Sequence, residues 1–131
     1  MINVGVIGLG IGLQHLKACS ECDNARIYFL CDQNPVKLKQ VAARYNPIRY
    51  STSATELLDD EDVDLVVVAS HDINHSSQVI RALTNKKHIF VEKPLCLTEK
   101  ELDQIYIAKQ NCEDKTFVCN IYCAKNHYLS V

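Results

Sequence analysis

The chain lacks the features that would indicate a nucleic-acid-binding or a membrane protein. Its 14 Lys and Arg residues are balanced by 16 Asp and Glu residues, so no basic surplus is available for binding nucleic acid. The longest unbroken apolar run, Leu65 to Ala69, is far shorter than the roughly 20 residues that a membrane-spanning helix needs. We therefore expect neither nucleic acid nor a membrane among its partners.

The sequence also lacks the marks of a secreted or an elongated protein. No basic stretch precedes an apolar segment at the N-terminus, so we expect no signal peptide. No internal repeat, low-complexity segment or block of like charges is present, and 131 residues fit one domain. The seven cysteines are odd in number, which, without a secretory signal, favours reduced thiols and a cytoplasmic localisation.

Glycine is scarce, but three of the four glycines stand at alternate positions near the N-terminus, as Gly8, Gly10 and Gly12. An apolar run of strand length, 2–7, precedes them, and a helical pattern follows at once. A strand that turns into a helix in this way presents backbone N–H groups and a helix dipole that favour a phosphate. Glycine lets a pyrophosphate approach the backbone closely. This pattern predicts a dinucleotide-binding βαβ unit, with Ile11 beside the glycines in the phosphate-binding turn.

Strand and helix patterns alternate along the rest of the chain. The expected strands lie at 2–7, 25–31, 48–50, 64–69, 88–91 and 116–119, and the expected helices at 12–22, 35–45, 54–58, 75–85 and 99–110. Such alternation implies a parallel sheet with right-handed crossovers, and the near-continuous Val run at 64–69 is typical of a strand buried on both faces. The predicted fold class is α/β, a doubly wound Rossmann-type parallel sheet of about six strands with helices on both faces.

Three residues are predicted to start helices. Asn34 stands directly before Pro35, which suits a first helical turn, so we expect Asn34 to be an N-cap. Ser53 and Thr98 are each followed three residues later by a glutamate, Glu56 or Glu101, which is the pattern of a capping box.

An acidic residue, Asp32, closes the second expected strand, 20 residues after Gly12. A carboxylate there accepts hydrogen bonds from both hydroxyls of an adenosine ribose and repels a 2′-phosphate. The next residue is Gln33 rather than an arginine that would hold that phosphate. The pattern therefore favours NAD over NADP as the cofactor. The alternative is a tight strand–helix turn with no ligand, in which Asp32 is a turn residue.

Polar residues follow the Val-rich strand, at the end where parallel strands form a ligand crevice. We predict that Ser70, His71, Asp72 and His75 lie at the cofactor. A metal held by His71 and His75, which are four apart, is disfavoured because His71 falls in the loop rather than on the helix. A third interpretation makes His75 a first-turn residue of the helix and the rest a solvated loop.

The fifth expected strand ends in Glu92-Lys93-Pro94. Proline fixes the local backbone and pushes Lys93 into an extended conformation, and the Lys93–Pro94 bond is a candidate for the cis form. An ammonium held at the crevice binds a substrate hydroxyl or carboxylate and tunes proton transfer. We therefore predict Glu92 and Lys93 at the cofactor and Lys93 as the catalytic residue. The alternative is a strand-end lysine in solvent.

The cysteine pairs do not predict a metal site. Cys19-x-x-Cys22 ends a helix, far along the chain from Cys119 and Cys123, and the usual residues of a zinc knuckle are absent. A redox-active pair would begin a helix, where the dipole lowers a thiol pKa. We interpret these thiols as core filler and surface residues, and predict no metal.

Together, these segments resemble the Gfo/Idh/MocA family, named for glucose–fructose oxidoreductase, inositol dehydrogenase and rhizopine catabolism proteins. The matching stretches are 4–15, 31–32, 66–75 and 91–95, in the family's order, and the resemblance runs from residue 1 to about 120. It implies that the glycine turn holds the NAD(P) pyrophosphate and that Asp32 holds the adenine ribose. Glu-Lys-Pro is the most specific element, and Lys93 matches the family's catalytic lysine, which contacts the reacting hydroxyl near the nicotinamide.

One loop departs from the family pattern. His75 matches the histidine that closes the family's Asn-x-x-His loop, whereas Asp72 stands where that Asn is usual and His71 where a proline is usual. The departures put the role of this loop in question.

The resemblance also implies a second domain, which in the family carries the substrate pocket, a catalytic histidine and usually the dimer interface. We expect a dinucleotide-binding domain at 1–120 and a tail at 121–131 where that domain would begin, with nothing to place His127 in the catalytic position. The chain would then be a truncated product, a fragment or a stand-alone module. Self-association is left open.

The expected function is that of an NAD(P)-dependent oxidoreductase, represented by its cofactor-binding domain. It would transfer a hydride between the nicotinamide and a hydroxyl-bearing carbon of a sugar, cyclitol or related polyol. The alternative is a non-catalytic nucleotide-binding module or truncated pseudoenzyme.

Overall fold

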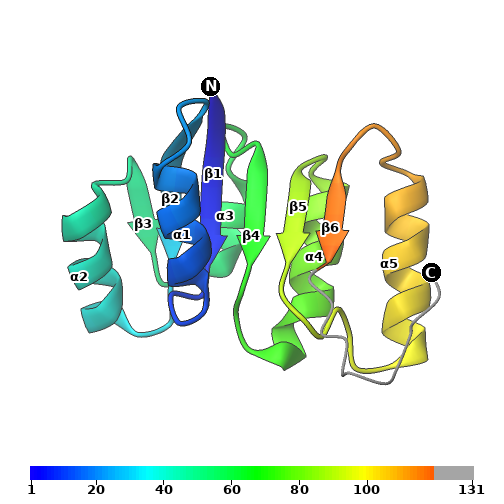
Figure 1. Cartoon of the computed structure of the whole chain (residues 1–131). Helices are drawn as coiled ribbons and strands as arrows, with labels where there is room; N and C mark the ends of the chain where they lie inside the picture. The colour runs from blue at the N-terminus through cyan, green and yellow to red at the C-terminus, as the bar shows by residue number, and fades with distance from the viewer. Residues whose placement is uncertain (120–131) are drawn as a thin grey trace, which may run out of the picture.

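All the strands run parallel in one sheet with the order β3-β2-β1-β4-β5-β6, so their carboxyl ends share one edge (Figure 1). The computed structural model describes residues 1–119. Its strands are β1 (Ile2–Ile7), β2 (Ala25–Cys31), β3 (Arg49–Ser51), β4 (Leu65–Val68), β5 (His88–Val91) and β6 (Phe117–Cys119). The predicted six-stranded parallel sheet is confirmed, and β3 lies one residue later than expected.

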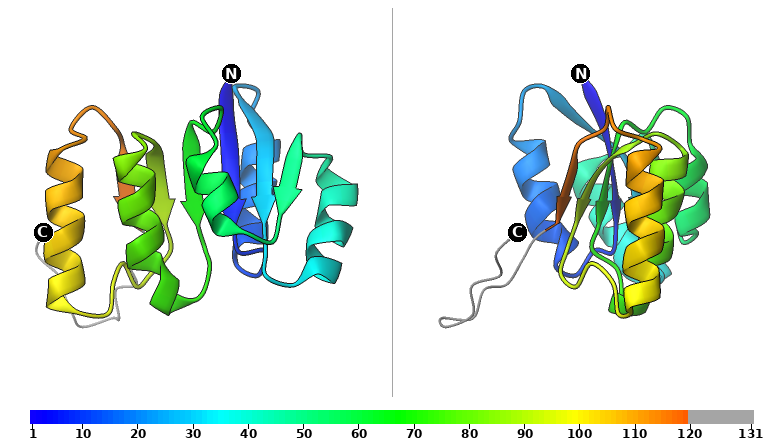
Figure 2. Two further views of the ribbon diagram at one scale, coloured as in Figure 1. Left: turned by 180° about the vertical axis from the view of Figure 1, so that it is seen from behind. Right: turned by 90° about the vertical axis from the view of Figure 1, so that its right-hand side faces the viewer.

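Helices cover both faces of this sheet. They are α1 (Gly12–Ser20), α2 (Pro35–Tyr45), α3 (Ala54–Asp59), α4 (His75–Thr84) and α5 (Glu99–Gln110), with a 3₁₀ turn, η1 (Asp72–Asn74), before α4. Figure 2 shows α1 on one face and α4 and α5 on the other. The doubly wound α/β architecture is therefore confirmed. None of the helices within residues 1–119 has the length and apolar character to cross a bilayer.

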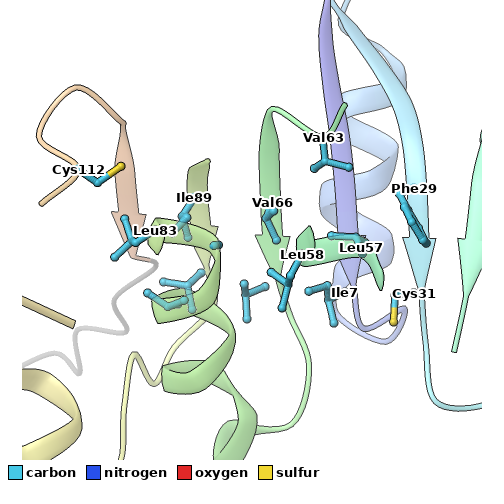
Figure 3. Close-up of a cluster of buried hydrophobic side chains, with 14 of the residues drawn as sticks. Ile7, Phe29, Cys31, Leu57, Leu58, Val63, Val66, Leu83, Ile89 and Cys112 are labelled. Atoms are coloured by element: carbon cyan, nitrogen blue, oxygen red, sulfur yellow. The ribbon is translucent and has the colours of Figure 1, made fainter. Parts of the chain in front are cut away.

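The sheet divides the core into two layers. Val66 and Val68 of β4 point into the layer under α3, α4 and α5, whereas Val67 points into the layer under α1 and α2. All three valines are buried, as the prediction of a strand covered on both faces requires. In Figure 3, Leu57 and Leu58 of α3 and Leu83 of α4 pack over this sheet in the first of the two layers.

Two of the three predicted helix caps are confirmed. The Asn34 side chain accepts hydrogen bonds from the backbone N–H groups of Val36 and Lys37. Thr98 and Glu101 form the complete capping box at the start of α5.

The capping box at Ser53 was wrong. Ser53 occupies the N-cap position of α3, but its side chain accepts no capping hydrogen bond, and its N–H donates to Ser51 Oγ at 3.0 Å. Glu56 instead carries its charge near Cys31, at the end of β2. The sequence pattern is present, but the short helix places the carboxylate elsewhere.

The strand order reverses between β1 and β4. From β1 the chain winds through β2 to β3 on one side, and from β4 through β5 to β6 on the other. In open α/β sheets the loops diverge at such a point and leave a crevice at the carboxyl edge. The glycine turn after β1 and the polar loop after β4 therefore face each other across this crevice.

Candidate functional site

A cleft of about 440 Å³ lies at the carboxyl ends of β1, β2 and β4. Six of the residues predicted to bind a cofactor line it, namely Gly8, Gly10, Ile11, Asp32, Ser70 and His71. Their neighbours in the lining are Ile7, Cys31, Gln33, Asn34, Lys37, Thr52, Ala54, Ala69, Asn74 and Gln78. The sheet thus brings together segments that lie some 60 residues apart in the sequence.

The three glycines of the first turn are needed for different reasons. Gly8 has a φ of +89°, and a Cβ added there would lie 2.3 Å from the carbonyl oxygen of Ala69, so the end of β4 excludes any side chain. A Cβ on the buried Gly12 would lie 3.1 Å from Val6 Cγ1, because α1 packs closely on β1. Gly10 is open, and its absent side chain leaves room for a ligand to approach the backbone.

Asp32 is held in place by the backbone at both of its carboxylate oxygens. Oδ2 accepts a hydrogen bond from the N–H of Leu9 and Oδ1 from the N–H of Asn34, each at 2.8 Å. An ionised carboxylate has about four acceptor positions, so each oxygen retains capacity for a further donor. The first bond also ties the end of β2 to the glycine turn. The carboxylate is therefore oriented in the cleft without a ligand.

The loop after β4 divides into residues that reach the cleft and one that does not. Ser70 lines the cleft, and its Oγ donates to Gln78 Oε1 at 2.6 Å. His71 also lines it and is exposed. Asp72 lies exposed in η1 and is not part of the lining, so the structure does not bring this predicted residue to the cleft.

His75 does not line the cleft either, because it is 1% exposed at the start of α4. Its Nδ1 lies 2.7 Å from the carbonyl oxygen of Pro94, and its Nε2 lies 2.8 Å from that of Ser70. Both ring nitrogens face backbone carbonyls, which leaves neither for a metal shared with His71. Within residues 1–119, no group of three or more His, Cys, Asp or Glu side chains is arranged to hold a metal ion. His75 joins the end of β4 to the loop after β5.

The Glu-Lys-Pro element lies beside the cleft rather than in its lining. Glu92 is buried, and its Oε1 lies 2.5 Å from Nε2 of His15 on α1. Lys93 is exposed and forms no hydrogen bond or ion pair with any residue in the described part of the chain. The Lys93–Pro94 peptide bond is cis. The lysine is thus presented to solvent from a turn that Glu92 and His75 anchor.

Gln78 and Lys37 are among the polar residues of the cleft that sequence reasoning missed. Gln78 lines it from α4, four residues after Asn74, the N-cap of that helix, which also lines the cleft. This spacing was a signal for a shared helical face. Lys37 lines it from the first turn of α2, five residues after Asp32. Its position in the helix capped by Asn34 was known, but the direction of its side chain was not.

Cys31 and Cys19 are not activated thiols. Burial, together with the negative charges of Asp32 and Glu56, raises the pKa of Cys31 in the cleft to about 12. Burial and the neighbouring Cys22 raise the pKa of Cys19. A raised pKa keeps a thiol protonated, which is the opposite of what redox or metal chemistry needs. Cys123, which follows Cys119 by four residues, and the rest of the tail at 121–131 lie outside the described residues.

Comparison with known proteins shows the family to which the chain belongs. A family model described as an oxidoreductase family with an NAD-binding Rossmann fold, GFO_IDH_MocA, matches residues 2–119. The chain is 34% identical over 105 residues to a myo-inositol 2-dehydrogenase of Thermotoga maritima, covering 79% of this chain and 31% of that protein. It is 35% identical over 112 residues to the 2,7-anhydro-N-acetylneuraminate hydratase of Escherichia coli, covering 84% and 29%.

Solved structures show the same arrangement of elements. The crystal structure of a probable dehydrogenase from Thermotoga maritima matches with a TM-score of 0.85 and 31% identity, over 90% of this chain and 35% of that one. The chain therefore spans about a third of the length of the relatives that it matches. With the family model covering nearly all the described residues, this chain belongs to the Gfo/Idh/MocA family of oxidoreductases with an NAD-binding Rossmann fold.

Proposed function

We propose that the cleft binds NAD and that the chain is the cofactor-binding part of an oxidoreductase. The reaction proposed is hydride transfer between the nicotinamide and a hydroxyl-bearing carbon of a sugar, cyclitol or related polyol. One observation carries the proposal: the open glycine turn at Gly10 and the oriented carboxylate of Asp32 line the same cleft. This cleft lies where the strand order reverses. The residues present fit a dinucleotide, because that cofactor needs both a phosphate-binding turn and an acceptor for its ribose hydroxyls.

The roles proposed for the lining residues follow from their chemistry. The backbone of the turn from Gly8 to Gly12 binds the pyrophosphate, and the two free acceptor positions of Asp32 bind the adenosine ribose. Ser70 and His71 extend the site along the end of β4. A negative charge at Asp32, followed by Gln33, disfavours a 2′-phosphate, so NAD is preferred over NADP.

Lys93 is the residue proposed to act on the substrate. The bound nicotinamide supplies the hydride donor or acceptor. The exposed ammonium of Lys93 holds the reacting hydroxyl and assists movement of its proton. Glu92 and His75 are proposed to act through Lys93, because they fix the turn that carries it.

Binding of the cofactor can be tested on the chain itself. NAD(H) is titrated against the wild-type chain and the Asp32→Ala and Asp32→Asn variants, by calorimetry or by NADH fluorescence. We expect each variant to bind at least ~10-fold more weakly, because a hydrogen bond to a charged group contributes about 1.5–3 kcal/mol. Asp32→Asn preserves the shape of the side chain, and Asp23→Asn, in the exposed turn at the opposite end of β2, is the matched control.

Two results would contradict the proposal. If the folded wild-type chain does not bind NAD(H), the cleft is not a dinucleotide site. If both Asp32 variants bind as tightly as wild type, the assignment of the ribose to Asp32 is wrong.

A second candidate function is a nucleotide-binding module without catalytic activity. It is favoured by the distribution of the predicted residues, since six of those predicted at the cofactor line the cleft, whereas Lys93 is the one candidate for substrate chemistry in the described chain. Turnover of NAD⁺ with a panel of polyols, measured as NADH absorbance, separates the two candidates.

The localisation proposed for this function is the cytoplasm. Residues 1–120 are proposed to form a dinucleotide-binding domain that acts with a substrate-binding unit. Within residues 1–119, no disulfide joins Cys19, Cys22, Cys31, Cys96 or Cys112, which suits a reducing compartment. Self-association is tested by sedimentation at several chain concentrations.

A further inference from the structure

A cation without a partner lies in the cleft. Lys37 is half-buried in the first turn of α2, and its Nζ is the nearest heavy atom, at 3.8 Å, to the position that a Cβ on Gly10 would take. The side chain of Lys37 forms no hydrogen bond or ion pair within residues 1–119. Its ammonium therefore lies over the one glycine of the turn whose face is open.

The placement of this side chain is set by the local backbone. Asn34 Oδ1 accepts a hydrogen bond from the N–H of Lys37 at 3.2 Å, which fixes the residue in the first turn of α2. The same loop contains Asp32, so one short segment supplies the cleft with both a carboxylate and an ammonium. These two groups do not form an ion pair with each other. The carboxylate is occupied by backbone donors instead.

The described chain supplies no acceptor for the Lys37 ammonium, so this charge is available to pair with an anionic group of a ligand in the cleft. The surface around it is the glycine turn, whose backbone N–H groups also favour an anion. Two independent features, a side-chain cation and an open backbone, thus converge on the space above Gly10. Hydrogen bonds between a cation and a phosphate are among the stronger ones in proteins.

We propose that Lys37 binds a phosphate of the dinucleotide in this cleft. The inference rests on the proposed function and assigns to that site a residue that sequence reasoning did not identify. Two phosphates are within the chemistry of the site, the 5′-pyrophosphate and an adenosine 2′-phosphate. If Lys37 binds the 2′-phosphate, its attraction for that group offsets the repulsion by Asp32. The chain would then prefer NAD over NADP less strongly than Asp32 alone would make it.

The test compares Lys37→Met with Lys39→Met. Both lysines lie on α2, but Lys39 is exposed and does not line the cleft, so it controls for the general effect of removing a positive charge. Calorimetric titrations use adenosine, ADP and adenosine 2′,5′-bisphosphate, with circular dichroism to check that each variant is folded. We expect Lys37→Met to lose about 10-fold in affinity for at least one phosphorylated ligand, without a change for adenosine.

The pattern of loss identifies the phosphate. An equal loss for ADP and the bisphosphate means that Lys37 binds the 5′-phosphates. A loss confined to the bisphosphate means that it binds the 2′-phosphate.

Equal affinities of Lys37→Met and Lys39→Met for both phosphorylated ligands would overturn the inference and leave the proposed function intact. Failure of the wild-type chain to bind any of these ligands or NAD(H) would overturn both.

Discussion

The Nε2 atom of His15, on α1, lies 2.5 Å from Oε1 of Glu92, directly after β5. Its ring also packs on Phe90, with ring centroids 4.6 Å apart. The helix that begins at the glycine turn is therefore tied directly to the residue that precedes Lys93. The two sequence motifs that predict a cofactor and a catalytic residue are parts of one connected structure.

This contact predicts energetic coupling between His15 and Glu92. Replacing His15 by alanine removes a hydrogen-bonding partner from a nearly buried carboxylate and a ring contact, so we expect a loss of about 1–3 kcal/mol in the free energy of unfolding. A double-mutant cycle of His15→Ala and Glu92→Ala, measured by urea unfolding, should give a coupling energy of at least about 0.5 kcal/mol. Strictly additive effects would mean that the contact contributes nothing.

Alanine at Gly8 and at Gly10 should have opposite consequences. At Gly8 the left-handed φ and the carbonyl of Ala69 oppose a Cβ, so we expect Gly8→Ala to lower the unfolding free energy by about 2–5 kcal/mol. Gly10→Ala should change it by no more than about 0.5 kcal/mol, yet weaken NAD(H) binding about 10-fold by blocking the backbone.

Urea unfolding and NADH titration on the two glycine variants check both halves of this prediction. Normal cofactor binding by Gly10→Ala would show that the open face of Gly10 has no role in binding, and a destabilised Gly10→Ala would show that this face does not accommodate a Cβ.

The stability of the chain should fall with rising pH because of Cys31. Its pKa is raised from 9.0 to about 12 in the folded state, so between these values the folded chain keeps a proton that the unfolded chain releases. The folded state then binds more protons, and its stability decreases as pH rises, by up to about 1.4 kcal/mol per pH unit.

Unfolding in urea at pH 8, 9 and 10, under reducing conditions, measures this slope. Cys31→Ala should have a shallower pH dependence than wild type, and Cys22→Ala, which removes an exposed thiol, should keep the wild-type slope. Identical slopes for wild type and Cys31→Ala would contradict the prediction.

The two capping-box sequences should differ in energetic value. Thr98 makes both bonds of the box, so Thr98→Ala should destabilise the chain by about 1 kcal/mol. Ser53 makes no side-chain capping bond, so Ser53→Ala should be nearly neutral. The midpoints of thermal unfolding of the two variants provide the measurement, and equal losses would mean that Ser53 caps α3 in solution.

The fold was predictable because its signals are local and periodic. The Val run of β4, the strand at Ala25–Cys31 and the helix at Pro35–Tyr45 all appear where the sequence pattern places them. Each depends on residues within one element. The boundaries that differed by one or two residues, at the ends of α1, α3 and α4 and at β3, β4 and β6, lie where single hydrogen bonds decide the terminal residue.

The site was predictable only in part, because side-chain direction depends on neighbours that are distant in the sequence. Asp32 and the glycine turn follow from strand ends and were found. His75 was expected at the cofactor but turns inward, toward a carbonyl 19 residues away at Pro94. The direction of Lys37 toward Gly10 depends in the same way on how α2 packs beside β2.

The hydrogen bond from the N–H of Leu9 to Asp32 limits which residues can replace Asp32. Leu9 is fully buried, so an aliphatic replacement at Asp32 would strand an amide in the interior. Serine, threonine and asparagine each have a side-chain oxygen that can accept the hydrogen bond from the N–H of Leu9. A variant designed for the phosphorylated coenzyme would therefore need one of these residues at position 32. If Asp32 binds the ribose as proposed, one side chain then serves both the stability of the fold and the choice of coenzyme.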